Sequence, residues 1–267
     1  RKLFPVKVNR LLSGAGQFVH AVDDVSFTLQ KAEILAVVGE SGCGKSTLAL
    51  TLIGLEKPTA GSIQFKGQEI AELNHHEWKA IRRQMQMIFQ DPYESLNPLM
   101  SVGELVAEPL QVHGIAASRS ERQQRVITAM EDAGLKPAES FINRHPHELS
   151  GGQRQRVAIA AALVLEPTIL LADEPVSMLD VSIRAEILNL LSDLRNKRGI
   201  SILFITHDLS TVATFADRIA VMYLGRMVEI DRTPQLVSTP KHPYTQALLS
   251  AIPEADPRIT RTKERIM

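Results

Sequence analysis

The stretch Ala36-Val-Val-Gly-Glu-Ser-Gly-Cys-Gly-Lys-Ser-Thr47 decides how the rest of this chain folds. The apolar, β-branched run Ile34–Val38 predicts a buried parallel strand, and residues 47–53 continue at helical spacing. Between them, Gly39–Ser46 fits the pattern G-x-x-x-x-G-K-[ST]. A strand, a glycine-rich loop and a helix in this order predict a loop that binds the phosphates of a nucleoside triphosphate.

The residue types of this loop suit phosphate binding. Glycines let successive backbone N–H groups turn toward one centre, and the helix start adds further N–H groups and the positive end of its dipole. Lys45 is expected to reach the β- and γ-phosphates, and the Ser46 hydroxyl to bind Mg²⁺. The alternative is a glycine-rich turn that binds nothing, which the strand and helix on either side disfavour. The predicted nucleotide-binding residues are Gly39, Ser41, Gly42, Cys43, Gly44, Lys45, Ser46 and Thr47.

Composition narrows the class of protein. The 267 residues allow one large domain or two modest ones. The 30 basic and 30 acidic residues cancel, so the protein has no overall positive potential that would attract nucleic acid. No uncharged apolar run reaches the length of a membrane span, so we expect any membrane role to come through a partner. The single cysteine, Cys43, excludes an internal disulfide and a cysteine-ligated metal cluster, and it suits a reducing cytosol.

The rest of the chain alternates strands with helices. Strands are predicted at Val19–Leu29, Met85–Phe89, and residues 168–172, 201–206 and 219–224. Residues 93–165 change to a helical pattern broken by prolines, typical of an inserted helical subdomain. The pattern predicts an α/β fold of the P-loop NTPase type. It has a mostly parallel central sheet, an N-terminal antiparallel β region and an inserted helical subdomain.

Polar residues follow two of the predicted strands. Asp173 and Glu174 end a buried strand, and carboxyl ends of parallel strands collect ligands. Asp173 suits a Mg²⁺ ligand, and Glu174 suits a group that orients or deprotonates water. His207 ends the next strand and is placed to donate a hydrogen bond to the γ-phosphate or the attacking water. The alternatives are an acidic turn and a structural histidine.

A second glycine-rich segment, Leu149-Ser-Gly-Gly-Gln153, opens another helix. Ser150 is a good N-cap, and the two glycines that follow it leave N–H groups open to a second anion. The alternative is a capped helix with a glycine hinge. Local chemistry does not identify the anion, and this segment lies far along the chain from the first loop.

The order of these motifs resembles that of the ATP-binding subunits of ABC transporters, over about residues 19–253. The resemblance implies a head-to-tail dimer in which two ATP molecules lie between one subunit's phosphate loop and the other subunit's Ser150, Gly151, Gly152 and Gln153. It also implies that Gln90 senses Mg²⁺ and the nucleophilic water, and that Asp180 links the two sites. Catalysis is then expected from Glu174, His207, Gln90 and Lys45, and Mg²⁺ coordination from Ser46, Gln90 and Asp173.

Two further segments resemble the oligopeptide and dipeptide importers within that family: residues 239–253 and residues 89–98. Relatives that import nickel or glutathione are an open alternative. The resemblance implies an ATP-binding domain over residues 1–240, with its helical subdomain at about 91–165. A C-terminal tail, residues 241–267, follows. Related tails continue into a cysteine-bearing segment that can hold an iron–sulfur cluster, so we expect this tail either to be truncated before that segment or to lack it.

The resemblance also implies partners. These are a second ATPase subunit, identical or paralogous, two transmembrane permease subunits, and indirectly an extracytoplasmic solute-binding protein; no nucleic acid is expected. We expect Tyr93–Met100 to contact the permease and the chain to lie at the cytoplasmic face of the membrane.

Three positions depart from the family pattern. Neither Phe18 nor His20 lies clearly where an adenine-stacking aromatic is expected, Met178 replaces a small residue, and Ala32 replaces a glycine. Two other functions were weighed. A non-transport ABC ATPase of translation or DNA repair is disfavoured by the single cassette and the balanced charge. An inactive regulatory subunit is disfavoured by the intact Lys45 and Glu174.

Overall fold

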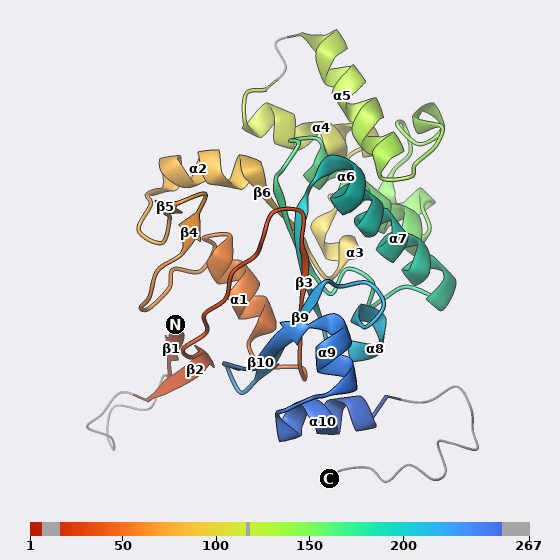
Figure 1. Ribbon diagram of the computed structural model, residues 1–267. Helices are drawn as coiled ribbons and strands as arrows, with labels where there is room; N and C mark the ends of the chain where they lie inside the picture. The colour runs from red at the N-terminus through yellow and green to blue at the C-terminus, as the bar shows by residue number, and fades with distance from the viewer. Residues whose placement is uncertain (7–16, 116–117, 253–267) are drawn as a thin grey trace, which may run out of the picture. The chain divides into compact units, whose positions relative to one another are not determined.

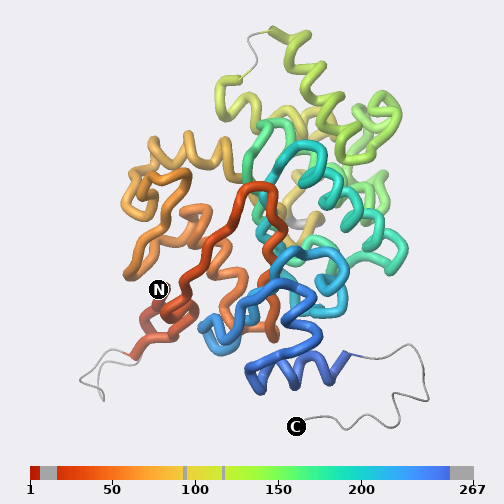
Figure 2. The backbone as a smooth tube through the Cα atoms, viewed as in Figure 1, coloured from red at the N-terminus to blue at the C-terminus, as the bar shows by residue number. Residues whose placement is uncertain are grey.

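The computed structural model describes residues 1–6, 17–115 and 118–252, and they divide into two compact units (Figures 1 and 2). The first unit comprises residues 1–29, 34–72 and those from 204 on, and the second comprises residues 30–33 and 73–203. Strand β8 (Ser201–Thr206) has residues in both units. No helix in the described part of the chain is long and apolar enough to cross a membrane.

The first unit holds the phosphate loop. Its elements are β1 (Lys2–Pro5), β2 (Phe18–Val22), β3 (Ile34–Val38), α1 (Lys45–Leu52), β4 (Gln64–Phe65), β5 (Gln68–Glu69), α8 (Leu209–Val212), β9 (Arg218–Tyr223), β10 (Arg226–Arg232), α9 (Thr233–Ser238) and α10 (Pro243–Ser250).

Strand β9 lies between β3 and β10 in this unit. It pairs parallel with β3 and antiparallel with β10, and β1 pairs antiparallel with β2. All residues of β3 are fully buried, as a strand covered on both faces requires. The backbone runs from β3 through the loop into helix α1, which is drawn in orange in Figure 1. The strand, loop and helix predicted from the sequence are therefore present.

The second unit is mainly helical. Its elements are α2 (His75–Gln84), β6 (Met85–Ile88), α3 (Pro92–Ser95), α4 (Val102–Val112), α5 (Arg119–Asp132), the 3-10 helices η1 (Ala138–Ser140) and η2 (Pro146–Glu148), α6 (Gly151–Leu163), β7 (Ile169–Asp173) and α7 (Val181–Arg198). Strands β6 and β7 pair in parallel. The predicted α/β fold, with a mostly parallel sheet and an antiparallel N-terminal pair, is confirmed. The domain limits at 91, 165 and 240 stay predictions.

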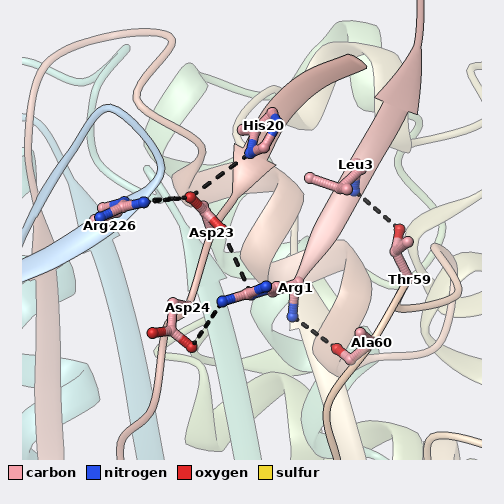
Figure 3. Close-up of polar contacts among 8 residues, drawn as sticks. All are labelled: Arg1, Leu3, His20, Asp23, Asp24, Thr59, Ala60 and Arg226. Carbon is pink, nitrogen blue, oxygen red and sulfur yellow. Dashed lines mark hydrogen bonds and ion pairs between the residues drawn. The ribbon is translucent and has the colours of Figure 1, made fainter. Parts of the chain in front are cut away.

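The predicted strand over Val19–Leu29 is wrong beyond Val22, and Figure 3 shows the reason. Asp23 accepts hydrogen bonds from Arg226 Nη2 at 2.7 Å and Nε at 3.2 Å, and His20 Nδ1 lies 3.6 Å away. The hydrogen bond from Arg226 holds the pKa of the Asp23 carboxyl below its ordinary value. Asp24 then takes a left-handed φ of 60°, which ends the extended backbone.

Candidate functional site

The phosphate loop is shaped by two close backbone approaches. A Cβ on Gly39 would lie 2.1 Å from the Met222 carbonyl oxygen, and one on Gly44 would lie 1.9 Å from the Ala21 carbonyl oxygen. Gly44 also caps α1 with a left-handed φ of 107°. The glycine positions of the pattern are therefore required by packing against β9 and β2 as well as by backbone conformation.

The Lys45 side chain is folded into this loop. Its ammonium donates to the carbonyl oxygens of Gly39 at 2.8 Å and Glu40 at 2.9 Å, and the residue is 5% exposed. Ser46 is exposed on the first turn of α1. The loop thus presents a cation and a hydroxyl at a helix start, which is the chemistry that a triphosphate and its metal ion require.

Cys43 is buried inside the same loop, 6% exposed. Burial raises the pKa of its thiol, although the nearby Lys45 ammonium acts in the opposite direction. We expect alkylation by iodoacetamide to be slower than for a free thiol and to accelerate as the pH is raised, because the thiolate is the reactive form. Fully modified protein should lose ATP binding because the added group crowds the loop. Mass spectrometry and equilibrium binding check both points; rapid modification at neutral pH, or normal affinity afterwards, would contradict them.

In the second unit, strand pairing brings two predicted residues together. Ile88 of β6 is opposite Ala172 of β7, so Gln90 and Glu174 follow their strands at equivalent positions. Gln90 Nε2 donates to Glu174 Oε2 at 3.3 Å. The parallel register therefore places an amide beside the carboxylate that the sequence predicts to act on water.

The backbone at Glu174 is held in an uncommon conformation. Its φ is 46°, a left-handed value for a residue that precedes a proline. Ser177 fixes the Glu174 carbonyl oxygen twice, from its N–H at 3.2 Å and its hydroxyl at 3.0 Å. Such strain is concentrated at functional sites, where the surroundings over-determine the backbone. Asp173, one residue earlier, is buried at the end of β7.

The second glycine-rich segment forms the start of α6. Ser150 accepts a hydrogen bond from the Gln153 N–H at 3.3 Å, and Gln153 Oε1 accepts one from the Ser150 N–H at 3.0 Å. This capping box fixes the entry into the helix. Gly152 is buried, and a Cβ there would lie 2.5 Å from Ile183 Cγ2 of α7. Packing between two helices is therefore a reason for Gly152 that the sequence interpretation did not include.

The remaining predicted residues lie at the surface of their units. Asp180 is the exposed N-cap of α7, and Met178 before it is 57% exposed. His207 is exposed directly after β8 and precedes Asp208, the N-cap of α8. Each has the exposure that a contact with a ligand or a partner requires.

The two candidates for an adenine contact both lie on β2. Phe18 is 51% exposed, and the His20 side chain is 57% exposed. The next residue along, Ala21, touches the phosphate loop at Gly44. His20 is therefore nearer in sequence than Phe18 to the residue that contacts Gly44. Which of the two contacts adenine stays a prediction.

The predicted Mg²⁺ ligands are oxygen donors from three segments: the Ser46 hydroxyl, the Gln90 amide and the Asp173 carboxylate. This donor set fits a hard ion that completes its shell with phosphate oxygens and water. The described residues contain no cluster of three or more histidine, cysteine or acidic side chains placed to hold a metal ion by themselves.

Comparison with known proteins agrees with these features. Residues 22–177 match the ABC transporter family model, and residues 228–266 match the model of the oligopeptide/dipeptide transporter C-terminal region. The chain is 49% identical over its whole length to the dipeptide transport ATP-binding protein DppF of Haemophilus influenzae, of which it covers 80%. It is 50% identical to the oligopeptide transport ATP-binding protein OppF of Escherichia coli, over 91% of this chain and 72% of that protein.

Among solved structures, a dimeric ATP-binding cassette in a post-hydrolysis state bound to ADP and phosphate is similar to this fold. The TM-score is 0.76 at 32% identity, over 87% of this chain and 96% of the other. Because 87% of this chain is covered, the similarity extends over parts of both units.

Proposed function

This chain belongs to the ABC transporter family, and we propose that its ATPase activity drives the import of oligopeptides or dipeptides through a membrane permease. The observation that carries the ATPase part of the proposal is the pairing of Gln90 with Glu174 at 3.3 Å, in a cassette that also holds an intact phosphate loop. Peptide as the solute is supported by the names of the relatives and by the match over residues 228–266.

Each site residue is proposed to have one task in hydrolysis. Lys45 and the loop N–H groups bind the phosphates, and Glu174 orients or deprotonates the water. Gln90 positions the Glu174 carboxylate, to which it donates. Exposed His207 hydrogen-bonds the γ-phosphate. Ser46, Gln90 and Asp173 would hold Mg²⁺, which would neutralise negative charge on the phosphate oxygens.

A second ATPase subunit is proposed to complete the site. Ser150 to Gln153 form a rigid helix start whose N–H groups and dipole favour an anion, and they would meet the ATP of the partner. Asp180 would link the two sites. Support comes from the exposed apolar side chains that flank Asp180, since Met178 is 57% and Val181 80% exposed. ATP bridging two subunits would favour the closed dimer, and hydrolysis would remove the bridge.

The permease is proposed to dock on Tyr93–Met100, at the cytoplasmic face of the membrane. Within this segment Leu96 is buried and anchors the loop, whereas Leu99 is 86% exposed. An apolar side chain held out by a fixed loop suits insertion into a partner. Residues 1–240 would then be the ATP-binding domain and residues 241–267 the tail, whose last part, 253–267, lies outside the described residues.

Reconstitution in lipid vesicles tests the proposal. The chain, its permease subunits and the solute-binding protein from neighbouring genes are combined, and ATP hydrolysis and solute uptake are measured with tripeptide, nickel and glutathione. We expect peptide-loaded binding protein to stimulate hydrolysis several-fold, with uptake into the vesicles. Stimulation by nickel or glutathione in place of peptide would overturn the solute assignment. Failure to associate with permease subunits would overturn the transport role itself.

A further inference from the structure

A tyrosine from the C-terminal region contacts the phosphate loop. The N–H of Glu40 donates to the Tyr244 hydroxyl oxygen at 3.2 Å, although the two residues are 204 positions apart. Tyr244 lies in the first turn of α10, which is shown in dark blue in Figure 1. Glu40 lies within residues 22–177, which match the ABC transporter model, whereas Tyr244 lies beyond them, within residues 228–266.

With this contact, the peptide group between Gly39 and Glu40 is hydrogen-bonded at both its N–H and its carbonyl end. The N–H of Glu40 and the carbonyl of Gly39 belong to the same planar, trans unit, so they point in opposite directions. Tyr244 holds the N–H side, and the Lys45 ammonium holds the carbonyl side at 2.8 Å. Hydrogen bonds at the two ends of an amide polarise and strengthen each other. Tyr244 therefore acts on the same peptide that positions the phosphate-binding lysine.

Helix α10 is fixed to the first unit at its start. The Glu229 carboxylate of β10 accepts hydrogen bonds from the N–H groups of Lys241 at 2.9 Å and His242 at 3.0 Å. His242 caps the helix by accepting from the Tyr244 N–H at 3.1 Å, and Lys241 pairs with Asp231 at 3.2 Å. These bonds leave the first turn of α10 little freedom, so the Tyr244 hydroxyl is held in place.

The hairpin turn between β9 and β10 supports the same arrangement. The rings of Tyr223 and Tyr244 lie 4.3 Å apart between centroids. The Gly225 N–H donates to the carbonyl oxygen of Cys43 at 2.9 Å, which ties this turn to the loop. Tyr244 is thus seated between the loop and a turn that itself contacts the loop.

We propose that Tyr244 is a positioning residue for the phosphate loop, through which the C-terminal region sets the affinity for ATP. This proposal rests on the proposed ATPase activity of the chain and adds a further residue to the same site. With the hydroxyl in place, the Gly39–Glu40 peptide is already oriented before nucleotide arrives, and binding does not have to order it. Without the hydroxyl the peptide gains freedom, and the loop must be ordered when ATP binds.

The test compares Tyr244→Phe with the unchanged protein, using the full chain. This variant keeps the ring in contact with Tyr223 and removes the hydroxyl alone. We expect the Kd for MgADP, measured by calorimetry, and the KM for ATP to rise about threefold to tenfold, the scale of one neutral hydrogen bond. The kcat at saturating ATP and the melting temperature should stay unchanged, because Glu174 and the core are untouched.

Tyr223→Phe is the matched control. It removes a hydroxyl from the other ring of the pair, which has no contact with Glu40 among the interactions of the described residues, and it should leave the Kd unchanged. Equal nucleotide affinity in Tyr244→Phe and the unchanged protein would overturn the proposal. So would a loss of kcat and of melting temperature without a change in Kd, which is the mark of a purely structural role. If the unchanged protein bound no nucleotide, the ATPase assignment would fail instead.

Discussion

Replacing Glu174 with glutamine is expected to lower the rate of ATP hydrolysis by at least about tenfold while ATP binding persists. The change keeps size and shape but removes the base. The glutamine side chain still offers an amide oxygen to Gln90 Nε2, so the 3.3 Å contact between the two side chains can persist. The left-handed backbone at this position is fixed by Ser177, which is untouched. Single-turnover hydrolysis and MgATP binding measure the two effects separately.

Gln90→Ala provides the matched comparison. It removes the donor but leaves the carboxylate, so hydrolysis should fall less than in Glu174→Gln. A glutamine variant with undiminished turnover would refute the role of Glu174. A larger loss in Gln90→Ala than in Glu174→Gln would show that positioning matters more than basicity.

The elements around the site were predictable because local patterns specify them. Strand β3 has the predicted bounds Ile34–Val38 and β8 the predicted bounds Ser201–Thr206. The first is apolar throughout and the second has an apolar centre between Ser201 and Thr206, and both strands are buried, as a sheet covered on two faces requires. The pairing of Gln90 with Glu174 follows from parallel strands that end at the same edge. Helix α2 (His75–Gln84) was missed although its signal was present: Asn74 and Glu77 form a capping box.

Contacts between distant segments could not be predicted from the sequence. The strand predicted to reach Leu29 stops at Val22 because Asp23 is bound by Arg226, 203 positions away. The hydrogen bond from Glu40 to Tyr244 is of the same kind. Periodicity and spacing in the sequence do not predict such pairs, because the tertiary fold determines which strand and helix ends lie next to each other. The sequence identified the chemistry of the loop, and the fold determines what holds the loop in place.

Gly44→Ala is expected to abolish nucleotide binding, with a Kd for MgADP raised about a hundredfold or more. Two costs add. An L-residue at a left-handed φ of 107° costs about 1–2 kcal/mol. In addition, the new methyl group would lie 1.9 Å from the Ala21 carbonyl oxygen and 2.9 Å from Met222 Cε. Because the first neighbour is backbone, the start of α1 has to move, and Lys45 and Ser46 move with it.

Two glycine variants separate these costs. A Cβ on Gly42, inside the loop at a φ of 80°, or on Gly67, between β4 and β5 at a φ of 81°, would meet nothing within 4 Å. Gly67→Ala should lower the melting temperature modestly and leave nucleotide affinity unchanged. Gly42→Ala should weaken binding, though less than Gly44→Ala, because it adds strain without displacing the helix. If all three variants bound MgADP equally, the close approach of β2 to the loop would have no part in binding. If MgADP affinity fell progressively from Gly67→Ala to Gly42→Ala to Gly44→Ala, the close approach of β2 would be shown to hold the loop in the conformation that binds nucleotide.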